Sequence, residues 1–136
     1  MSAAMIKLQP VVAFREFPFG TIHDPSMREF TAPVPGEHQP AVLAYLRSGH
    51  ILGYPMNADL PDWFDPSNRA NPIIDGSPLG GVTPMTDGVW VWPAGLIYFV
   101  ERYHVILSQE FLDHAARNDW LVDKQTVGHG EYDYDY

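Results

Sequence analysis

The longest patterned run of apolar residues extends from Thr86 to Trp120. Asp87-Gly88 is a typical turn, and residues 89–92 alternate between valine and tryptophan as a short strand does. Both faces of this strand are apolar, so we expect it to be central or to have its tryptophan face covered by a helix. The core is expected to be built on this stretch.

Two helices are expected after the strand. Pro93 is expected to open the first, in which apolar side chains recur at helical spacing. Ser108 is a favourable N-cap for the second helix, and Asn118 is expected to close it. The apolar faces consist of Leu96, Phe99, Val100 and Tyr103 in the first helix and of Phe111, Leu112, Ala115 and Ala116 in the second.

The first half of the chain is expected to contain another helix and two more strands. Pro40 suits the first turn of this helix, and Gly49 is placed where a left-handed C-terminal cap belongs. Strands are expected at 50–54 and at 11–15, the latter next to the break made by Pro10. These elements predict an α+β fold, a small and mainly antiparallel sheet packed with about three helices.

Two segments within the single domain expected for residues 1–136 have no regular periodicity. Residues 57–84 form a long loop rich in proline, and loops of this length are usually functional or mobile. Within it, residues 72–74 look like a short buried segment followed by an Asp75-Gly76 turn. The acidic tail at 128–136 is expected to be mobile unless another part of the chain holds it.

Composition narrows the function classes. The absence of cysteine excludes disulfides and thiolate chemistry. A formal net charge of −9 disfavours binding to nucleic acid or to anionic membranes and favours association with a basic partner. No apolar run reaches the length of a membrane span, and the N-terminus does not resemble a signal peptide, so we expect a cytoplasmic protein.

No catalytic motif stands out. The chain has no nucleophile elbow and no phosphate-binding loop. Glu101 and His104 have the Glu-x-x-His spacing of carboxylate-bridged metal sites, but those sites need a second such motif, and Glu110 with His114 is a poor match. We therefore expect no enzyme activity, metal or cofactor. The alternative is a small enzyme acting on a metabolite through His104 or His114 with a nearby carboxylate.

The stronger signal is one of surface recognition, because tyrosine and tryptophan anchor many interfaces and acids pair with basic partners. An aromatic pair, Trp63-Phe64, stands among aspartates in the long loop, and tyrosines alternate with acids in the tail. A gap-filling role for the pair and a solubilising role for the tail remain open. The candidate contact residues are Asp59, Asp62, Trp63 and Asp65 in the loop and Glu131, Tyr132, Asp133, Tyr134, Asp135 and Tyr136 in the tail.

Four short segments carry a resemblance to a known family: residues 87–94 (DGVWVWPA), Tyr103-His104-Val105, Asn118-Asp119-Trp120 and residues 45–50 (YLRSGH). Through them, about half of the chain resembles small bacterial immunity proteins of polymorphic toxin systems. The resemblance implies a protein without catalysis that binds a cognate toxin and occludes its active site. A nuclease or deaminase with a basic groove would suit the acidic charge. A third interpretation is an oligomeric scaffold whose exposed aromatics form a dimer interface.

Overall fold

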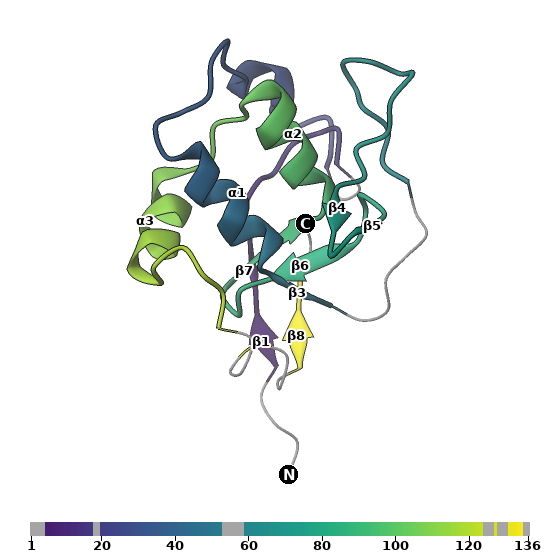
Figure 1. The fold of residues 1–136 in the computed structure, drawn as a ribbon. Helices are drawn as coiled ribbons and strands as arrows, with labels where there is room; N and C mark the ends of the chain where they lie inside the picture. Colours follow the sequence, from purple (N-terminus) through teal and green to yellow (C-terminus); the bar gives the residue numbers. More distant parts are fainter. Residues whose placement is uncertain (1–4, 18–19, 53–58, 124–126, 128–130, 135–136) are drawn as a thin grey trace.

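The computed structural model describes residues 5–17, 20–52, 59–123, 127 and 131–134, and it confirms the predicted α+β fold. In chain order the elements are β1 (Ile6–Lys7), β2 (Gln9–Pro10), the 3-10 helix η1 (Met27–Phe30), α1 (Gln39–Arg47), β3 (His50–Ile51), β4 (Ile73–Ile74), β5 (Ser77–Pro78), β6 (Pro84–Thr86), β7 (Trp90–Pro93), α2 (Gly95–Tyr103), α3 (Gln109–Arg117) and β8 (Tyr132–Asp133) (Figure 1). None of the helices in these ranges is long and apolar enough to cross a bilayer.

A small mixed sheet of four strands lies under the helices, in the order β2-β7-β6-β3 (Figure 1). The pairs β3–β6 and β6–β7 are antiparallel, as predicted, whereas β2 pairs with β7 in parallel. Two further pairs lie outside this sheet: β1 with β8, which is parallel, and the β4–β5 hairpin, which is antiparallel. Both parallel pairs therefore come from the N-terminal segment.

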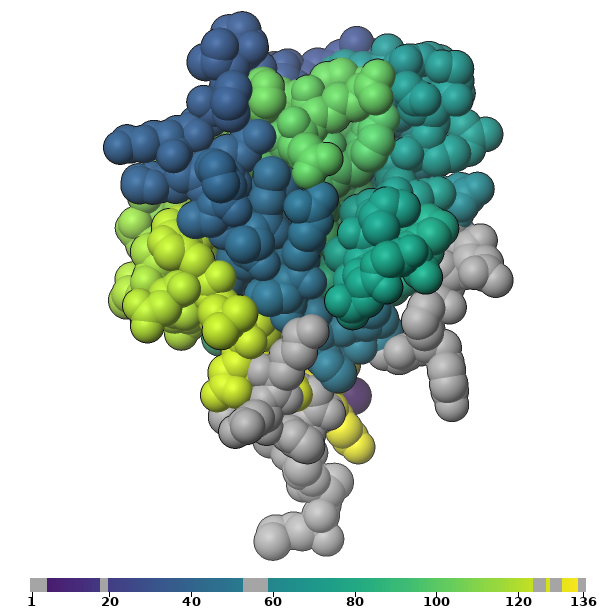
Figure 2. Space-filling model, viewed as in Figure 1, coloured from purple at the N-terminus to yellow at the C-terminus, as the bar shows by residue number. Residues whose placement is uncertain are grey.

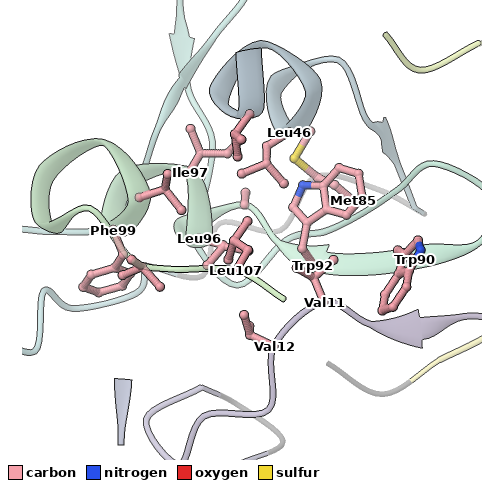
Figure 3. Close-up of a cluster of buried hydrophobic side chains, with 14 of the residues drawn as sticks. Val11, Val12, Leu46, Met85, Trp90, Trp92, Leu96, Ile97, Phe99 and Leu107 are labelled. Atoms are coloured by element: carbon pink, nitrogen blue, oxygen red, sulfur yellow. The ribbon is translucent and has the colours of Figure 1, made fainter. Parts of the chain in front are cut away.

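The strand β7 is central and fully buried, as its two apolar faces predicted. Trp90 and Trp92 pack in the large core beneath the helices (Figure 3). Val91 faces the other way, into a smaller cluster with Leu8 and Leu52. The alternation of residue types in β7 therefore divides the interior into two cores, one on each face of the sheet.

The helix α2 begins two residues later than predicted. Pro93 is the last residue of β7 and lies opposite Pro84 in the ladder. The N–H of Ala94 continues the pairing by donating to the carbonyl of Thr83 at 2.8 Å. Helical structure then starts at Gly95, because the backbone of the two preceding residues is paired with the neighbouring strand segment.

The helical apolar patterns are largely confirmed. Leu96, Phe99 and Val100 of α2 are buried. Ser108 caps α3 by accepting a hydrogen bond from the N–H of Phe111 at 3.3 Å. Buried residues of α3 are Phe111 and Ala115, while Leu112 is half-buried and Ala116 is exposed.

The strand predicted at 11–15 is wrong in position. The paired segment is Gln9–Pro10, where the N–H groups of Gln9 and Val11 donate to the carbonyls of Val89 and Val91, each at 2.9 Å. Pro10 lies between these two donors, at a position where the parallel ladder uses no N–H. The proline is therefore accommodated inside the strand instead of interrupting it.

Gly49 is not a left-handed cap, which corrects the prediction from sequence. Its φ is not positive, and the N–H of Ser48 closes α1 by bonding to the carbonyl of Ala44 at 3.1 Å. A Cβ at position 49 would lie 2.5 Å from the indole ring of Trp92. Glycine is needed there because the tryptophan packs directly against the backbone.

The strand expected at 50–54 is found at His50–Ile51, and residues 53–54 lie outside the described ranges.

The described part of the long loop, from residue 59 onward, contains more regular structure than expected. Asp75 and Gly76, with φ angles of 51° and 82°, form the predicted turn, which joins β4 to β5. The burial expected for residues 72–74 holds in part: Pro72 is buried and Ile74 is half-buried, but Ile73 is 57% exposed. The loop also ends earlier than predicted, because β6 begins at Pro84.

Candidate functional site

The loop at 59–72 is fixed to α2 by the carboxylate of Asp62. Its Oδ2 atom accepts hydrogen bonds from the hydroxyls of Tyr98 at 2.7 Å and Tyr103 at 2.6 Å. Its Oδ1 atom accepts from the backbone N–H groups of Phe64 at 2.8 Å and Asp65 at 3.1 Å. Asp62 is only 1% exposed, so we correct its assignment as a contact residue: it is an internal anchor.

The environment of Asp62 keeps its carboxylate ionised. Burial acts to raise the pKa, but the hydrogen bonds from Tyr103, Tyr98 and the backbone outweigh it and hold the pKa below its ordinary value of 3.8. Burial and the bond to Asp62 raise the pKa of Tyr98 to about 12, so its hydroxyl remains the donor. The cluster therefore has one fixed protonation pattern around neutral pH.

Arg102 lies across the outer side of this cluster. Its Nε atom is 3.9 Å from Asp62 Oδ2, and its Nη2 atom is 3.7 Å from Asp65 Oδ2. The guanidinium also lies over the rings of Tyr98 and Tyr103, at 5.9 Å and 5.8 Å from their centroids. Part of the loop's negative charge is thus balanced locally.

The aromatic pair of the loop divides between the interior and the surface. Phe64 packs on Tyr103, with 4.4 Å between ring centroids, and fills the gap beside α2. Trp63 is 39% exposed, and its carbonyl accepts a hydrogen bond from Arg28 Nη2 at 2.9 Å. The gap-filling interpretation therefore holds for Phe64, and Trp63 is presented to solvent on an anchored backbone.

The two other aspartates of the loop remain near the surface. Asp59 is exposed and accepts a hydrogen bond from Asn71 Nδ2 at 2.8 Å. Asp65 is half-buried and accepts from Ser67 Oγ at 2.6 Å and from Asn68 Nδ2 at 2.9 Å. These bonds hold both carboxylates in place on either side of Trp63 in the sequence.

The described part of the tail is held by pairing with the N-terminal strand β1. The N–H of Ile6 donates to the carbonyl of Glu131 at 2.8 Å, and Tyr132–Asp133 forms the strand β8. The alternation of acids and tyrosines in this part of the tail is therefore the alternation of a β-strand. Glu131 and Asp133 are exposed, while Tyr132 and Tyr134 are half-buried against the smaller core.

The loop and the tail do not form one surface. In Figure 1 the strand β8 is at the lower end of the molecule, and the loop at 59–72 is at the upper right. The predicted contact residues therefore separate into two regions. Asp135 and Tyr136 lie outside the described residues.

A second buried carboxylate, Asp87, brings the tight turn before β7 into contact with two helices. Its Oδ2 atom accepts a hydrogen bond from the Tyr45 hydroxyl at 2.5 Å and lies 3.2 Å from His114 Nε2. Its Oδ1 atom accepts from the N–H groups of Val89 at 2.9 Å and Trp90 at 2.7 Å. His114 therefore has the neighbouring carboxylate that the enzyme interpretation requires, although that carboxylate already binds three other donors.

A hollow of about 340 Å³ opens beside this cluster, and Tyr45, Asp87 and Asn118 contribute to its lining. His114 does not line it. Burial and the bond to Asp87 raise the pKa of Tyr45, so this hydroxyl is a poor proton donor to a ligand. Among the described residues, the lining of this hollow contains no histidine.

His104 has a different setting. It ends α2 with a left-handed φ of 56°, and its Nδ1 atom is 3.0 Å from Gln39 Oε1. No carboxylate in the described residues forms an ion pair with it. Within the same ranges, no group of three or more His, Cys, Asp or Glu side chains is placed to bind a metal.

Sequence reasoning missed the residues that organise the loop, namely Tyr98, Arg102 and Arg28. Tyr103 was assigned to the apolar stripe of α2, without a partner for its hydroxyl. A signal was present, because a tyrosine that is part of a buried helix face usually needs a hydrogen-bond partner for its hydroxyl. Asp62 is 36 and 41 residues away from its two tyrosine partners, so the spacing along the chain gave no indication of the pairing.

Comparisons of this chain with protein-family models, with curated proteins and with solved structures find no match.

Proposed function

We propose that this protein is an immunity protein that binds a cognate bacterial toxin and inhibits it by occluding the toxin's active site. A nuclease or deaminase with a basic groove is the class of toxin that suits the charge of the chain. The immunity protein would act in the cytoplasm and would need no cofactor or catalysis of its own.

The observation that carries the proposal is the presentation of Trp63 by an anchored loop. Tryptophan is frequent among the residues that dominate binding energy. The four hydrogen bonds to Asp62 and the bond from Arg28 hold the backbone on both sides of Trp63 before any partner arrives. A loop that is already ordered loses less conformational entropy on binding.

The charge of the chain supports a basic partner. The net charge is −9, and Asp59 lies exposed in the same loop as Trp63. Acids near an anchor residue attract lysine and arginine during encounter and impose a register on the complex. Glu131 and Asp133, at the other end of the molecule, would contribute to this field and need not touch the same partner surface.

The test is co-expression with the toxin domain encoded beside this gene, followed by measurement of association rates. We expect a 1:1 complex whose association rate falls by about tenfold between low and high salt. A stable complex with a salt-independent rate would contradict the electrostatic part. If no complex forms and light scattering instead shows that the isolated chain is a dimer, the scaffold interpretation gains and this proposal fails.

A second candidate function, a small enzyme, is favoured by one observation, the 3.2 Å distance between His114 and Asp87. Its test is to incubate a metabolite extract with the wild-type protein and with His114→Ala and to compare the products by mass spectrometry. Turnover that only the wild type performs would support catalysis. Identical profiles from both proteins and from a blank would remove this candidate.

A further inference from the structure

An apolar groove of about 330 Å³ lies between the segment that leads into α1, the C-terminal end of α2 and the linker to α3. Val42, Val100 and Leu112 contribute to its walls. Val34 and Ile106 also line it and are 65% and 56% exposed, so large apolar side chains face solvent there. This volume is typical of sites that enclose a small ligand or one large side chain.

The apolar surface continues beyond the groove. A second hollow of about 310 Å³ shares Ile106 and Leu107 with it and extends to Phe30, which is 37% exposed. Phe30 ends η1, the short helix whose Arg28 binds the carbonyl of Trp63. In Figure 2 the segment before α1 and the loop that carries Trp63 lie on the two sides of α2. Groove and loop are thus connected through η1.

Two polar side chains of the groove, Glu37 and His104, offer hydrogen-bond acceptors. Among the described residues that line the two hollows, Glu37 is the one with a formal charge. His104 also lines the groove, and in the neutral ring its Nδ1–H donates to Gln39 Oε1. The lone pair is then on Nε2, which makes no hydrogen bond with the described part of the chain. Both groups complement a cationic donor.

We propose that this groove receives one large apolar side chain, flanked by lysine or arginine, from the partner polypeptide. The inference rests on the proposed function, because it gives the same basic partner a second contact next to Trp63. Burial of the apolar side chain supplies the affinity, and Glu37 with His104 selects the basic flanks.

The test uses the full chain with labelled methyl groups and NMR titration with capped pentapeptides. The probe has a central leucine between two lysine pairs, and the matched peptides replace leucine by alanine or the lysines by glutamates. We expect the lysine–leucine peptide to shift the methyl signals of Val34, Val42 and Ile106. We expect its affinity to exceed that of the alanine peptide by about tenfold, and we expect the acidic peptide not to bind.

A matched pair of variants locates the site. Ile106 and Ile73 are almost equally exposed, at 56% and 57%, so we expect the protein to fold with an aspartate at either position. Ile106→Asp should abolish the methyl shifts, and Ile73→Asp on β4 should leave them unchanged.

Equal binding of the leucine and alanine peptides, or persistence of the shifts in Ile106→Asp, would overturn the inference. So would groove signals that change with protein concentration alone, since a second copy of the chain would then occupy the groove. None of these measurements uses the toxin. A toxin complex without peptide binding therefore removes only this inference, and peptide binding without a toxin complex removes only the proposed function.

Discussion

The two buried aspartates, Asp62 and Asp87, have nearly the same hydrogen-bonding pattern but connect different parts of the molecule. Each accepts two backbone N–H groups from its own turn and at least one tyrosine hydroxyl from a helix. Asp62 joins an irregular loop to α2 and lies near Arg102. Asp87 joins the turn between β6 and β7 to α1 and α3 and lies near His114.

The difference between them lies in what each turn presents. The Asp87 turn connects two central strands, and its aromatic neighbour, Trp90, is buried. The neighbour of Asp62, Trp63, is 39% exposed. The two residues of the Asp62-Trp63 pair therefore have different roles. The carboxylate of Asp62 holds the loop together from inside, and the side chain of Trp63 remains exposed and available for recognition.

Of the substitutions that test this comparison, we expect Asp62→Ala to have the largest effect on stability. Removal of the carboxylate leaves the hydroxyls of Tyr98 and Tyr103 and two backbone N–H groups without their acceptor, so we expect a loss of about 3 kcal/mol in the free energy of unfolding. Urea denaturation measures it. Asp59→Ala is the control, because Asp59 is exposed, and we expect about 0.5 kcal/mol or less there. Equal losses at the two positions would show that Asp62 is not an anchor.

A smaller effect is expected from Tyr45→Phe, which removes one donor to Asp87. Asp87 keeps its two backbone donors, so the loss should be about 1 kcal/mol in the free energy of unfolding. A double-mutant cycle of Tyr45→Phe with Asp87→Asn measures the coupling. Additive losses would mean that the short contact between the hydroxyl and the carboxylate contributes nothing to stability.

The pH dependence of stability should single out Asp62. Its folded pKa is below that of the unfolded chain, so its contribution is present above the unfolded value near 4 and is lost as the pH falls through the folded pKa. Thermal unfolding between pH 6 and pH 2.5 should therefore show a shallower acid decline in Asp62→Asn than in the wild type. An identical decline in both proteins would contradict the lowered pKa.

The parts of the fold that depend on local patterns could be predicted from the sequence. The turn at Asp87-Gly88, the alternation in β7 and the cap at Ser108 each involve residues that are neighbours in the chain. The strand β6 was missed because Pro84 and the short apolar segment around it read as loop. A hairpin at Asp87-Gly88 requires a strand before it as well as after it, and that requirement was the available signal.

The candidate site was harder to predict because its contacts are distant in sequence. Trp63 was selected for its residue type, and its exposure is consistent with that choice. The burial of Asp62 depends on α2, and the pairing of β8 with β1 joins the two ends of the chain. No local pattern distinguishes an acid that faces a partner from one that holds a loop in place.

The central claim, that an anchored loop presents Trp63 to a basic partner, is tested most directly by the Kd of the toxin complex for the wild type and for Trp63→Ala. Ile22→Ala, at a side chain that is 86% exposed, is the control, and each variant's Tm is measured alongside. We predict that Trp63→Ala raises the Kd by about 30-fold or more with little change in Tm, and that Ile22→Ala leaves both unchanged. A Trp63→Ala protein that binds the toxin as tightly as the wild type would contradict the claim.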